Sequence, residues 1–134
     1  FRKKITSWLD AYTNTSIVKS EVVVNGRKRQ LQGQSNYVLN GGLNFHKGKN
    51  TFNLSYNRVG DRISAVGFQG YPDIFENSRD VVDIVILRKI KNGEIKLAVS
   101  DIFKQPFEYY QKPNRTLIKT NNETTVSLTL NYNL

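Results

Sequence analysis

Apolar and polar residues alternate along most of this chain, which is the pattern of β-strands with two different faces. The clearest stretch is the last one, where Val126, Leu128, Leu130, Tyr132 and Leu134 alternate with Thr125, Ser127, Thr129, Asn131 and Asn133. Five further stretches with the same period cover residues 94–100, 80–90, 51–57, 36–45 and, least cleanly, part of 5–22. The pattern therefore predicts an all-β chain of about six antiparallel strands with almost no helix.

Short and long connections alternate between the predicted strands. Residues 46–50 and 91–93 are tight hairpin turns that contain glycine, whereas the connections near 23–34, 59–79 and 104–123 are long. A structureless connection of about twenty residues is uncommon in a compact soluble domain. Short turns at one end of the strands and long loops at the other are typical of outer-membrane β-barrels, in which the loops are extracellular and the turns periplasmic.

The polar rows of the strands also favour a transmembrane barrel. Most of their residues are Asn, Ser, Thr and Gly, which suit a wet barrel interior, whereas the outer rows of soluble sandwiches are rich in Lys and Glu. The apolar rows would then face lipid. The predicted lipid-facing surface includes Leu43, Leu54, Ile84, Leu97 and Leu128, and the opposite surface includes Asn44, Ser55, Asp83, Lys96 and Ser127.

Aromatic residues gather near both ends of the predicted strands. Phe45, Phe52 and Tyr132 lie near the short turns, and Tyr56 and Phe103 lie near the long loops. Two girdles of this kind mark the two membrane interfaces of a barrel. Charged residues on the apolar rows, namely Arg58, Arg88 and Asp101, fall at predicted strand ends, where a charge reaches water at small cost.

Composition and charge exclude several classes of protein. The chain has 134 residues, no cysteine and one histidine, His46, so we expect no disulfide scaffold, no metal site, no cofactor and no catalytic thiol. A formal charge of +9 suggests an anionic partner, either nucleic acid or lipid phosphate. No apolar run reaches the roughly 18 residues that a membrane helix needs. Because the chain begins at Phe1, we expect a processed or truncated piece.

The second long loop contains the candidate ligand-binding residues, although charged loop residues are more often solvated or paired locally. These candidates are Asp61, Arg62, Asp73, Glu76 and Arg79. Asp83 and Asp101 are expected on different faces of neighbouring strands, so they do not form a convincing carboxylate pair. The strongest basic cluster, Arg27–Arg29, could contact lipopolysaccharide phosphates or be a solvated loop tip. No arrangement of acid, base and nucleophile is evident, and the sequence predicts no enzyme.

Several segments, in this order and spacing, resemble the C-terminal part of the TonB-dependent receptors of Bacteroidetes-type bacteria. The resemblance covers roughly Leu9 to the end of the chain. The segments are Gln32-Gly33-Gln34-Ser35-Asn36-Tyr37-Val38-Leu39-Asn40, Ser55-Tyr56-Asn57-Arg58-Val59-Gly60-Asp61-Arg62-Ile63, Pro72-Asp73-Ile74-Phe75-Glu76, Val99-Ser100-Asp101-Ile102-Phe103-Lys104-Gln105-Pro106-Phe107 and Asn131-Tyr132-Asn133-Leu134. The closing strand is similar to the C-terminal assembly signal of such barrels, although Leu134 stands where an aromatic residue is usual.

The resemblance implies a 22-stranded outer-membrane barrel with an N-terminal plug, which imports large or scarce nutrients with energy relayed by TonB. Six strands cannot close a membrane barrel, since the smallest single-chain barrels have eight. Residues 1–134 would therefore be the C-terminal portion of the barrel, with the plug and the remaining strands missing. The expected partners are those missing parts, TonB through the missing N-terminal part, and outer-membrane lipid including lipopolysaccharide. The sequence does not indicate whether a surface lipoprotein is a further partner.

Two alternatives from other classes remain. A soluble β-barrel that binds lipid would need about ten short strands and an inward apolar row. A basic nucleic-acid-binding domain of the OB type would carry cations and aromatic residues along one strand face, whereas here the cations fall mostly in turns and loops. We therefore expect no nucleic-acid partner. A need for detergent would separate the barrel from both alternatives.

Overall fold

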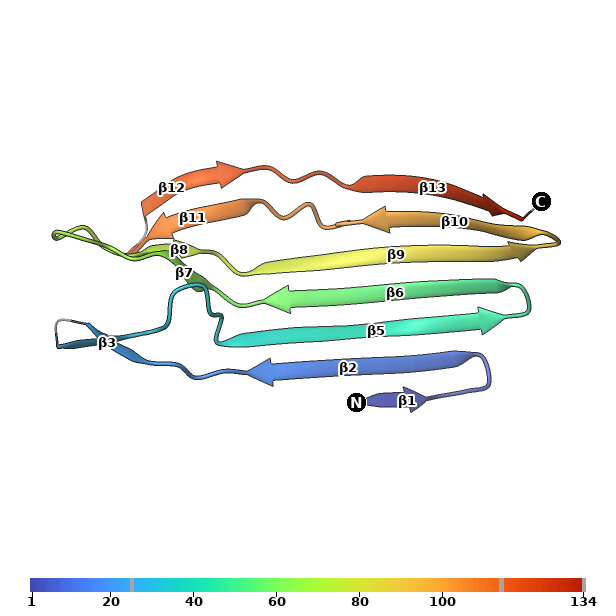
Figure 1. Ribbon diagram of the computed structural model, residues 1–134, viewed down its shortest axis with the longest axis horizontal. Helices are drawn as coiled ribbons and strands as arrows, with labels where there is room; N and C mark the ends of the chain where they lie inside the picture. The colour runs from blue at the N-terminus through green and yellow to red at the C-terminus, as the bar shows by residue number, and fades with distance from the viewer. Residues whose placement is uncertain (25, 114, 134) are drawn as a thin grey trace.

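The computed structural model describes residues 1–24, 26–113 and 115–133, and these residues are all-β with no helix. Seven antiparallel strands form the main sheet, in the order β1-β2-β5-β6-β9-β10-β13 (Figure 1). Their bounds are β1 (Arg2–Lys4), β2 (Leu9–Ile17), β5 (Tyr37–Lys47), β6 (Asn50–Val59), β9 (Arg79–Ile90), β10 (Gly93–Ser100) and β13 (Thr125–Tyr132). The six predicted strands are all present, and β1 is an additional short strand that the sequence pattern did not predict.

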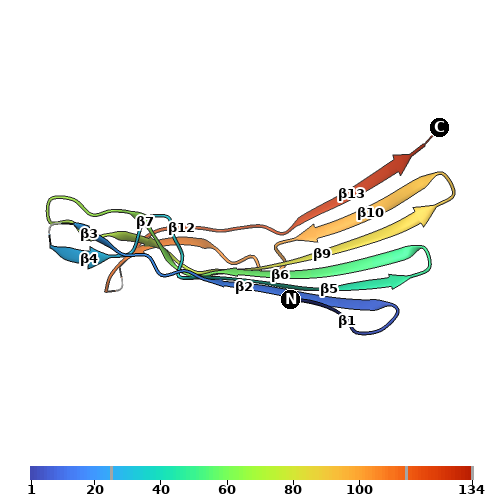
Figure 2. The same ribbon diagram turned by 60° about the horizontal axis from the view of Figure 1, so that its bottom comes forward.

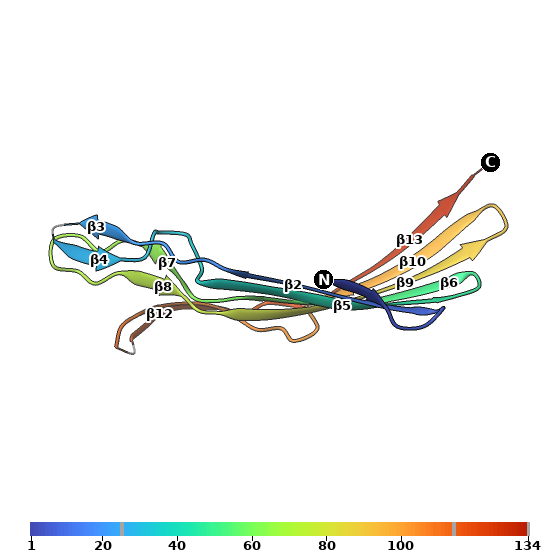
Figure 3. The same ribbon diagram turned by 90° about the horizontal axis from the view of Figure 1, so that it is seen from below.

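The main sheet is open. β1 and β13 lie at its two edges, and each pairs with one neighbour only among the described residues. Figures 2 and 3 show a single curved layer, with β10 and β13 bending away from the plane of β2 and β5. Residue 134, which closes the predicted C-terminal strand, lies outside the described residues.

The three connections predicted to be long contain short strands of their own. A second sheet has the order β12-β11-β8-β7, and β3 pairs with β4 in a separate hairpin. The bounds are β3 (Val22–Val24), β4 (Arg27–Arg29), β7 (Arg62–Ala65), β8 (Ile74–Glu76), β11 (Phe107–Gln111) and β12 (Arg115–Thr120). These strands have only 3 to 6 residues each, too few to show an alternating pattern. Backbone pairing with a neighbouring strand stabilises each of them.

The strand register confirms the predicted division of side chains between two faces. Leu43 pairs with Leu54, Leu54 with Ile84, and Leu97 with Leu128, so these residues share one face. Directly paired residues on antiparallel strands project to the same side of a sheet. We call this side the apolar face. The polar face carries the alternating residues between them, including Asn44, Ser55, Asp83, Lys96 and Ser127.

The main sheet has no hydrophobic core on either side. Ile63, which is 2% exposed and lies in the second sheet, is the one buried hydrophobic residue among those described. Large side chains of the apolar face are open to the surroundings. They include Ile17, Ile86, Ile95, Val126, Leu128 and Leu130. In a soluble sandwich or barrel this face would pack against another layer, and among the described residues no second sheet pairs with or covers it.

The two short turns lie at the same end of the main sheet. Gly48 and Lys49 connect β5 to β6, and Lys91 and Asn92 connect β9 to β10. Gly48 has a φ of 58°, a left-handed conformation that glycine adopts without strain. The second sheet and the β3–β4 hairpin lie at the opposite end (Figure 1). The predicted alternation of short turns and long excursions is therefore present in the structure.

Candidate functional site

Amide side chains form cross-strand contacts on the polar face of the main sheet. The Asn57 amide donates a hydrogen bond to the Asn40 side-chain carbonyl, and Asn53 donates to Asn44 in the same way. Each of these pairs joins β5 to β6 at directly opposed positions. The polar face thus presents neutral hydrogen-bonding groups, which suit contact with water, a polar solute or another polar protein surface.

A hollow of about 170 Å³ lies where the polar face meets the second sheet. Three of the predicted site residues, Arg62, Glu76 and Arg79, come together in its lining. The remaining lining residues are Asn57, Val59, Gly60, Asn77, Val81 and Phe107. They come from β6, β7, β8, β9 and β11 and the short segments beside them, so the site depends on the junction between the two sheets.

Arg62 and Glu76 form a bidentate ion pair at this hollow. The Arg62 Nε lies 3.0 Å from Glu76 Oε2, and the Arg62 Nη2 lies 3.1 Å from Oε1 and 2.9 Å from Oε2. Their strands place them directly opposite each other, since Arg62 pairs with Glu76 in the β7–β8 register. The two parallel hydrogen bonds fix the plane of the guanidinium. The pair therefore offers an oriented, overall neutral surface to a polar ligand.

Arg79 is held between a carboxylate and an aromatic ring. Its Nη1 lies 2.9 Å from Asp101 Oδ2, and its guanidinium carbon lies 4.0 Å from the centroid of the Phe107 ring. Cation–π contact and the ion pair together restrict the side chain. Arg79 thus connects β9 to the segment after β10 and to the first residue of β11.

Asp101 occupies a different position from the one expected. It lies just after β10 in a left-handed conformation, with a φ of 54°, and its side chain turns to the polar face. Its backbone N–H donates to Asp83 Oδ1 at 2.8 Å, so the expectation that Asp83 and Asp101 lie apart on different faces is wrong. The Asn122 amide and the Thr124 hydroxyl also donate to Asp101. This 8% exposed residue therefore ties β9 and β10 to the segment that leads into β13.

Asp61 and Asp73, the other two predicted site residues, lie outside this hollow. Burial raises the pKa of the Tyr110 hydroxyl above its ordinary value, and the nearby Asp61 carboxylate adds to this increase. Asp73 accepts a hydrogen bond of 2.7 Å from the Gly67 N–H, and its Oδ1 lies 3.7 Å from the Arg29 Nη1. Of the five candidate ligand contacts in the second long loop, Arg62, Glu76 and Arg79 line one hollow, and Asp61 and Asp73 lie outside it.

Asp73 lines a separate, larger hollow of about 1000 Å³ between the β3–β4 hairpin and the segment 66–73. Two aromatic side chains in this lining, Phe68 and Tyr71, are 74% and 76% exposed. The sequence analysis did not single out either residue, because neither belongs to an alternating row or a charged cluster.

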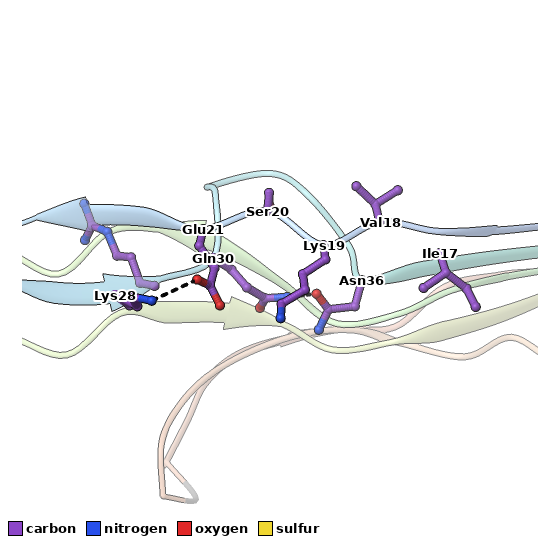
Figure 4. A pocket seen from close by; sticks show the side chains of 9 residues that line it. Ile17, Val18, Lys19, Ser20, Glu21, Lys28, Gln30 and Asn36 are labelled. Atoms are coloured by element: carbon purple, nitrogen blue, oxygen red, sulfur yellow. Dashed lines mark hydrogen bonds and ion pairs between the residues drawn. The ribbon is translucent and has the colours of Figure 1, made fainter.

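A third hollow, of about 510 Å³, lies at the end of β2 beside the β3–β4 hairpin (Figure 4). Its lining includes two members of the predicted basic cluster, Lys28 and Arg29. Lys28 lies 3.6 Å from Glu21, and Arg29 pairs with Asp73. The described members of the cluster are therefore paired locally, and the side chain of residue 27 lies outside the described part of the chain.

Charged residues at the second-sheet end of the apolar face are also paired. Arg58 donates two hydrogen bonds from Nη1 to Asp80, at 2.9 and 2.8 Å, and its Nε donates to the Tyr37 hydroxyl at 3.1 Å. The Tyr56 hydroxyl donates to Asp80 at 2.5 Å, and Gln105 adds a further hydrogen bond at 3.2 Å. Arg58 was expected at this strand end. Its partner Asp80 was not predicted from the sequence, because the two residues are 22 positions apart.

Within residues 1–24, 26–113 and 115–133, no group of three or more acidic or histidine side chains could hold a metal ion. The same residues include no helix that is long and apolar enough to cross a membrane. Comparisons with family models, curated proteins and solved structures each returned no match.

Proposed function

We propose that this chain is part of the wall of an outer-membrane β-barrel, and specifically the C-terminal portion of a TonB-dependent receptor for nutrient uptake. The observation that carries this proposal is the open, single-layer main sheet, which has one exposed apolar face and one polar face. In a bilayer, lipid would cover the apolar face and the polar face would line the barrel interior. Neither role requires a hydrophobic core within the sheet.

The two open edges support the same proposal. Unpaired backbone N–H and C=O groups cost several kcal/mol each in hydrocarbon, so the strands beside β1 and β13 must be supplied by the rest of a closed barrel. The proposed partners are therefore the remaining strands and the plug, with TonB acting through the N-terminal part. Localisation in the outer membrane of a Gram-negative bacterium follows from the proposal.

The alternatives explain the observations less well. A soluble lipid-binding barrel would enclose its apolar row, but Leu128 and Val126 are 73% and 64% exposed. An OB-type nucleic-acid surface carries unpaired cations and aromatic residues along one strand face. Here Arg58, Arg62 and Arg79 each pair with a carboxylate, and other cations lie at the ends of the strands and in the turns. The proposed contribution to transport comes from the 170 Å³ hollow and the segment 66–73, and it includes no catalytic step.

Membrane fractionation tests the proposal. We expect the assembled protein to sediment with outer membranes, to stay there after high-salt and alkaline washes, and to need detergent for extraction. A folded monomer that is recovered in buffer without detergent would contradict the proposal.

A double substitution in the segment 66–73 tests the proposed role of this segment in ligand binding. Replacing Phe68 and Tyr71 with Ser should reduce growth on the cognate nutrient, identified by screening a panel of nutrient sources, without reducing the amount of assembled barrel. A deletion of the whole segment 67–77 is unsuitable, because it would remove β8 and its pairing with β7 and β11. The matched control replaces the exposed Ile118 of β12 with Ser, which should leave growth unchanged. Unchanged growth of the Phe68/Tyr71 variant would exclude this segment from ligand capture.

A further inference from the structure

Cations line the short-turn end of the apolar face. Lys47 pairs with Asn50, and Asn50 pairs with Arg88, so these three residues form one row across β5, β6 and β9. The next row inward is Phe45, Phe52 and Ile86. Two residues of a strand span about 7 Å, so the cations lie one short step beyond the aromatic row.

The two turns extend this row of cations. Lys49 belongs to the β5–β6 turn, and its carbonyl accepts a hydrogen bond of 2.9 Å from the Lys89 N–H of β9. Lys91 begins the β9–β10 turn. We refer to Lys47, Lys49, Arg88 and Lys91 as the basic rim. All four side chains are exposed.

The basic rim lacks counter-ions within the part of the chain that the structure describes. None of its four residues takes part in an ion pair, whereas Arg58, Arg62 and Arg79 near the opposite end of the main sheet each pair with a carboxylate. Two acidic residues lie near this end. Asp10 is 3.6 Å from Arg2 and 3.9 Å from His46, and Glu94 is on the polar face, where Asn131 donates a hydrogen bond to it. Four uncompensated positive charges at one rim form an attractive site for anions.

Aromatic stacking beside the basic rim identifies the kind of anion. The rings of Trp8 and Phe45 stack with centroids 6.0 Å apart, and Phe45 contacts Phe52 edge to face at 5.6 Å. Trp and Phe beside Lys and Arg are typical of a membrane interface, where the rings lie at the headgroup level and the cations reach the phosphates. A soluble anion would engage the cations and leave the aromatic and apolar rows uncovered.

We propose that the basic rim binds the phosphate groups of anionic phospholipids, with their acyl chains lying along the rows of Phe45, Phe52 and Ile86. This inference rests on the proposed function, because the short-turn end lies in a lipid leaflet only if the main sheet is a barrel wall. It assigns a lipid-binding role to residues that the transport proposal leaves unused. Because the basic rim lies at the short-turn end, the proposal places the recognised anionic lipids in the leaflet at that end.

The test measures lipid binding by the assembled protein, isolated from membranes in detergent and stripped of lipid. Native mass spectrometry follows titration with phosphatidylglycerol, phosphatidylcholine or inorganic phosphate. The variant is Lys47→Gln with Arg88→Gln, and the control is Arg115→Gln with Lys119→Gln, which removes the same charge from exposed positions of β12. Each cation near an anionic lipid surface contributes about fivefold in affinity, so the variant should lose roughly 25-fold for phosphatidylglycerol. The control should bind like the wild type.

Several outcomes overturn the inference. They are equal binding of the two lipids by the wild type, equal losses in variant and control, and displacement of phosphatidylglycerol by inorganic phosphate at equal concentration. If the variant fails to assemble, the salt dependence of wild-type binding tests the inference instead. The affinity of the wild type for phosphatidylglycerol should fall as the salt concentration rises. An affinity that does not change with salt overturns the inference. A folded protein that needs no detergent and binds neither lipid would instead overturn the proposed function.

Discussion

Replacing Leu128 with Arg should destabilise the assembled protein far more than replacing its neighbour Ser127 with Arg. The two residues are adjacent in the middle of β13, but Leu128 pairs with Leu97 on the apolar face and Ser127 pairs with Ala98 on the polar face. An arginine that faces lipid near the bilayer midplane costs about 2 to 4 kcal/mol, which is roughly a 30- to 1000-fold change in the unfolding equilibrium. An arginine in a wet barrel interior should cost about 0.5 kcal/mol or less.

This pair of variants separates a membrane wall from a surface in water. Leu128 is 73% exposed, so in water its replacement by Arg would change stability by no more than about 0.5 kcal/mol. The assay is urea unfolding of the assembled barrel in phosphatidylcholine vesicles, followed by tryptophan fluorescence. Equal costs for the two variants, or a larger cost at Ser127, would refute the assignment of the apolar face to lipid.

Three further predictions concern Asp101, Tyr110 and Gly93. Replacing Asp101 with Ala should destabilise the protein by about 2 to 3 kcal/mol, because Arg79 loses its carboxylate partner, and chemical unfolding measures this loss. The pKa of Tyr110 is raised in the folded protein, so the free energy of unfolding should fall as pH rises above the ordinary tyrosine pKa. Tyr110→Phe should remove this part of the alkaline pH dependence. An unchanged dependence of the unfolding free energy on pH would contradict the prediction. Replacing Gly93 with Ala would place a Cβ 2.0 Å from the Asn131 carbonyl oxygen and should weaken β10–β13 pairing, seen as faster amide hydrogen exchange in β13.

Period-two alternation was enough to predict the six long strands and the division of their side chains between two faces. The register from Leu43 through Leu54 to Ile84 follows directly from that alternation together with the short turn at Gly48. The short glycine-containing turns also predicted the two hairpins, since so short a connection joins two strands that are adjacent and antiparallel. Local sequence patterns therefore contained most of the information on the main sheet.

The second sheet and the site depend on contacts that no local pattern encodes. β8 has 3 residues, and it pairs with β7 of the same connection and with β11 of the next long connection. Arg62 and Glu76 were both candidates from the sequence, but their pairing with each other requires the β7–β8 register. The left-handed backbone at Asp101 turns its side chain to the face opposite the one that alternation predicts. Such deviations arise from tertiary pairing at the ends of strands, where the period of two stops.

Lipid exposure of single cysteines along β10 tests the central claim most directly. The chain has no native cysteine, so fluorophores attached at positions 95, 97 and 99 of the apolar face and at 96 and 98 of the polar face report without background from this chain. With quenchers attached to lipid tails, the account predicts strong quenching at 95, 97 and 99 and weak quenching at 96 and 98. Quenching that is equal on the two faces, or absent from both in the assembled protein, would contradict the claim that this sheet is a membrane wall.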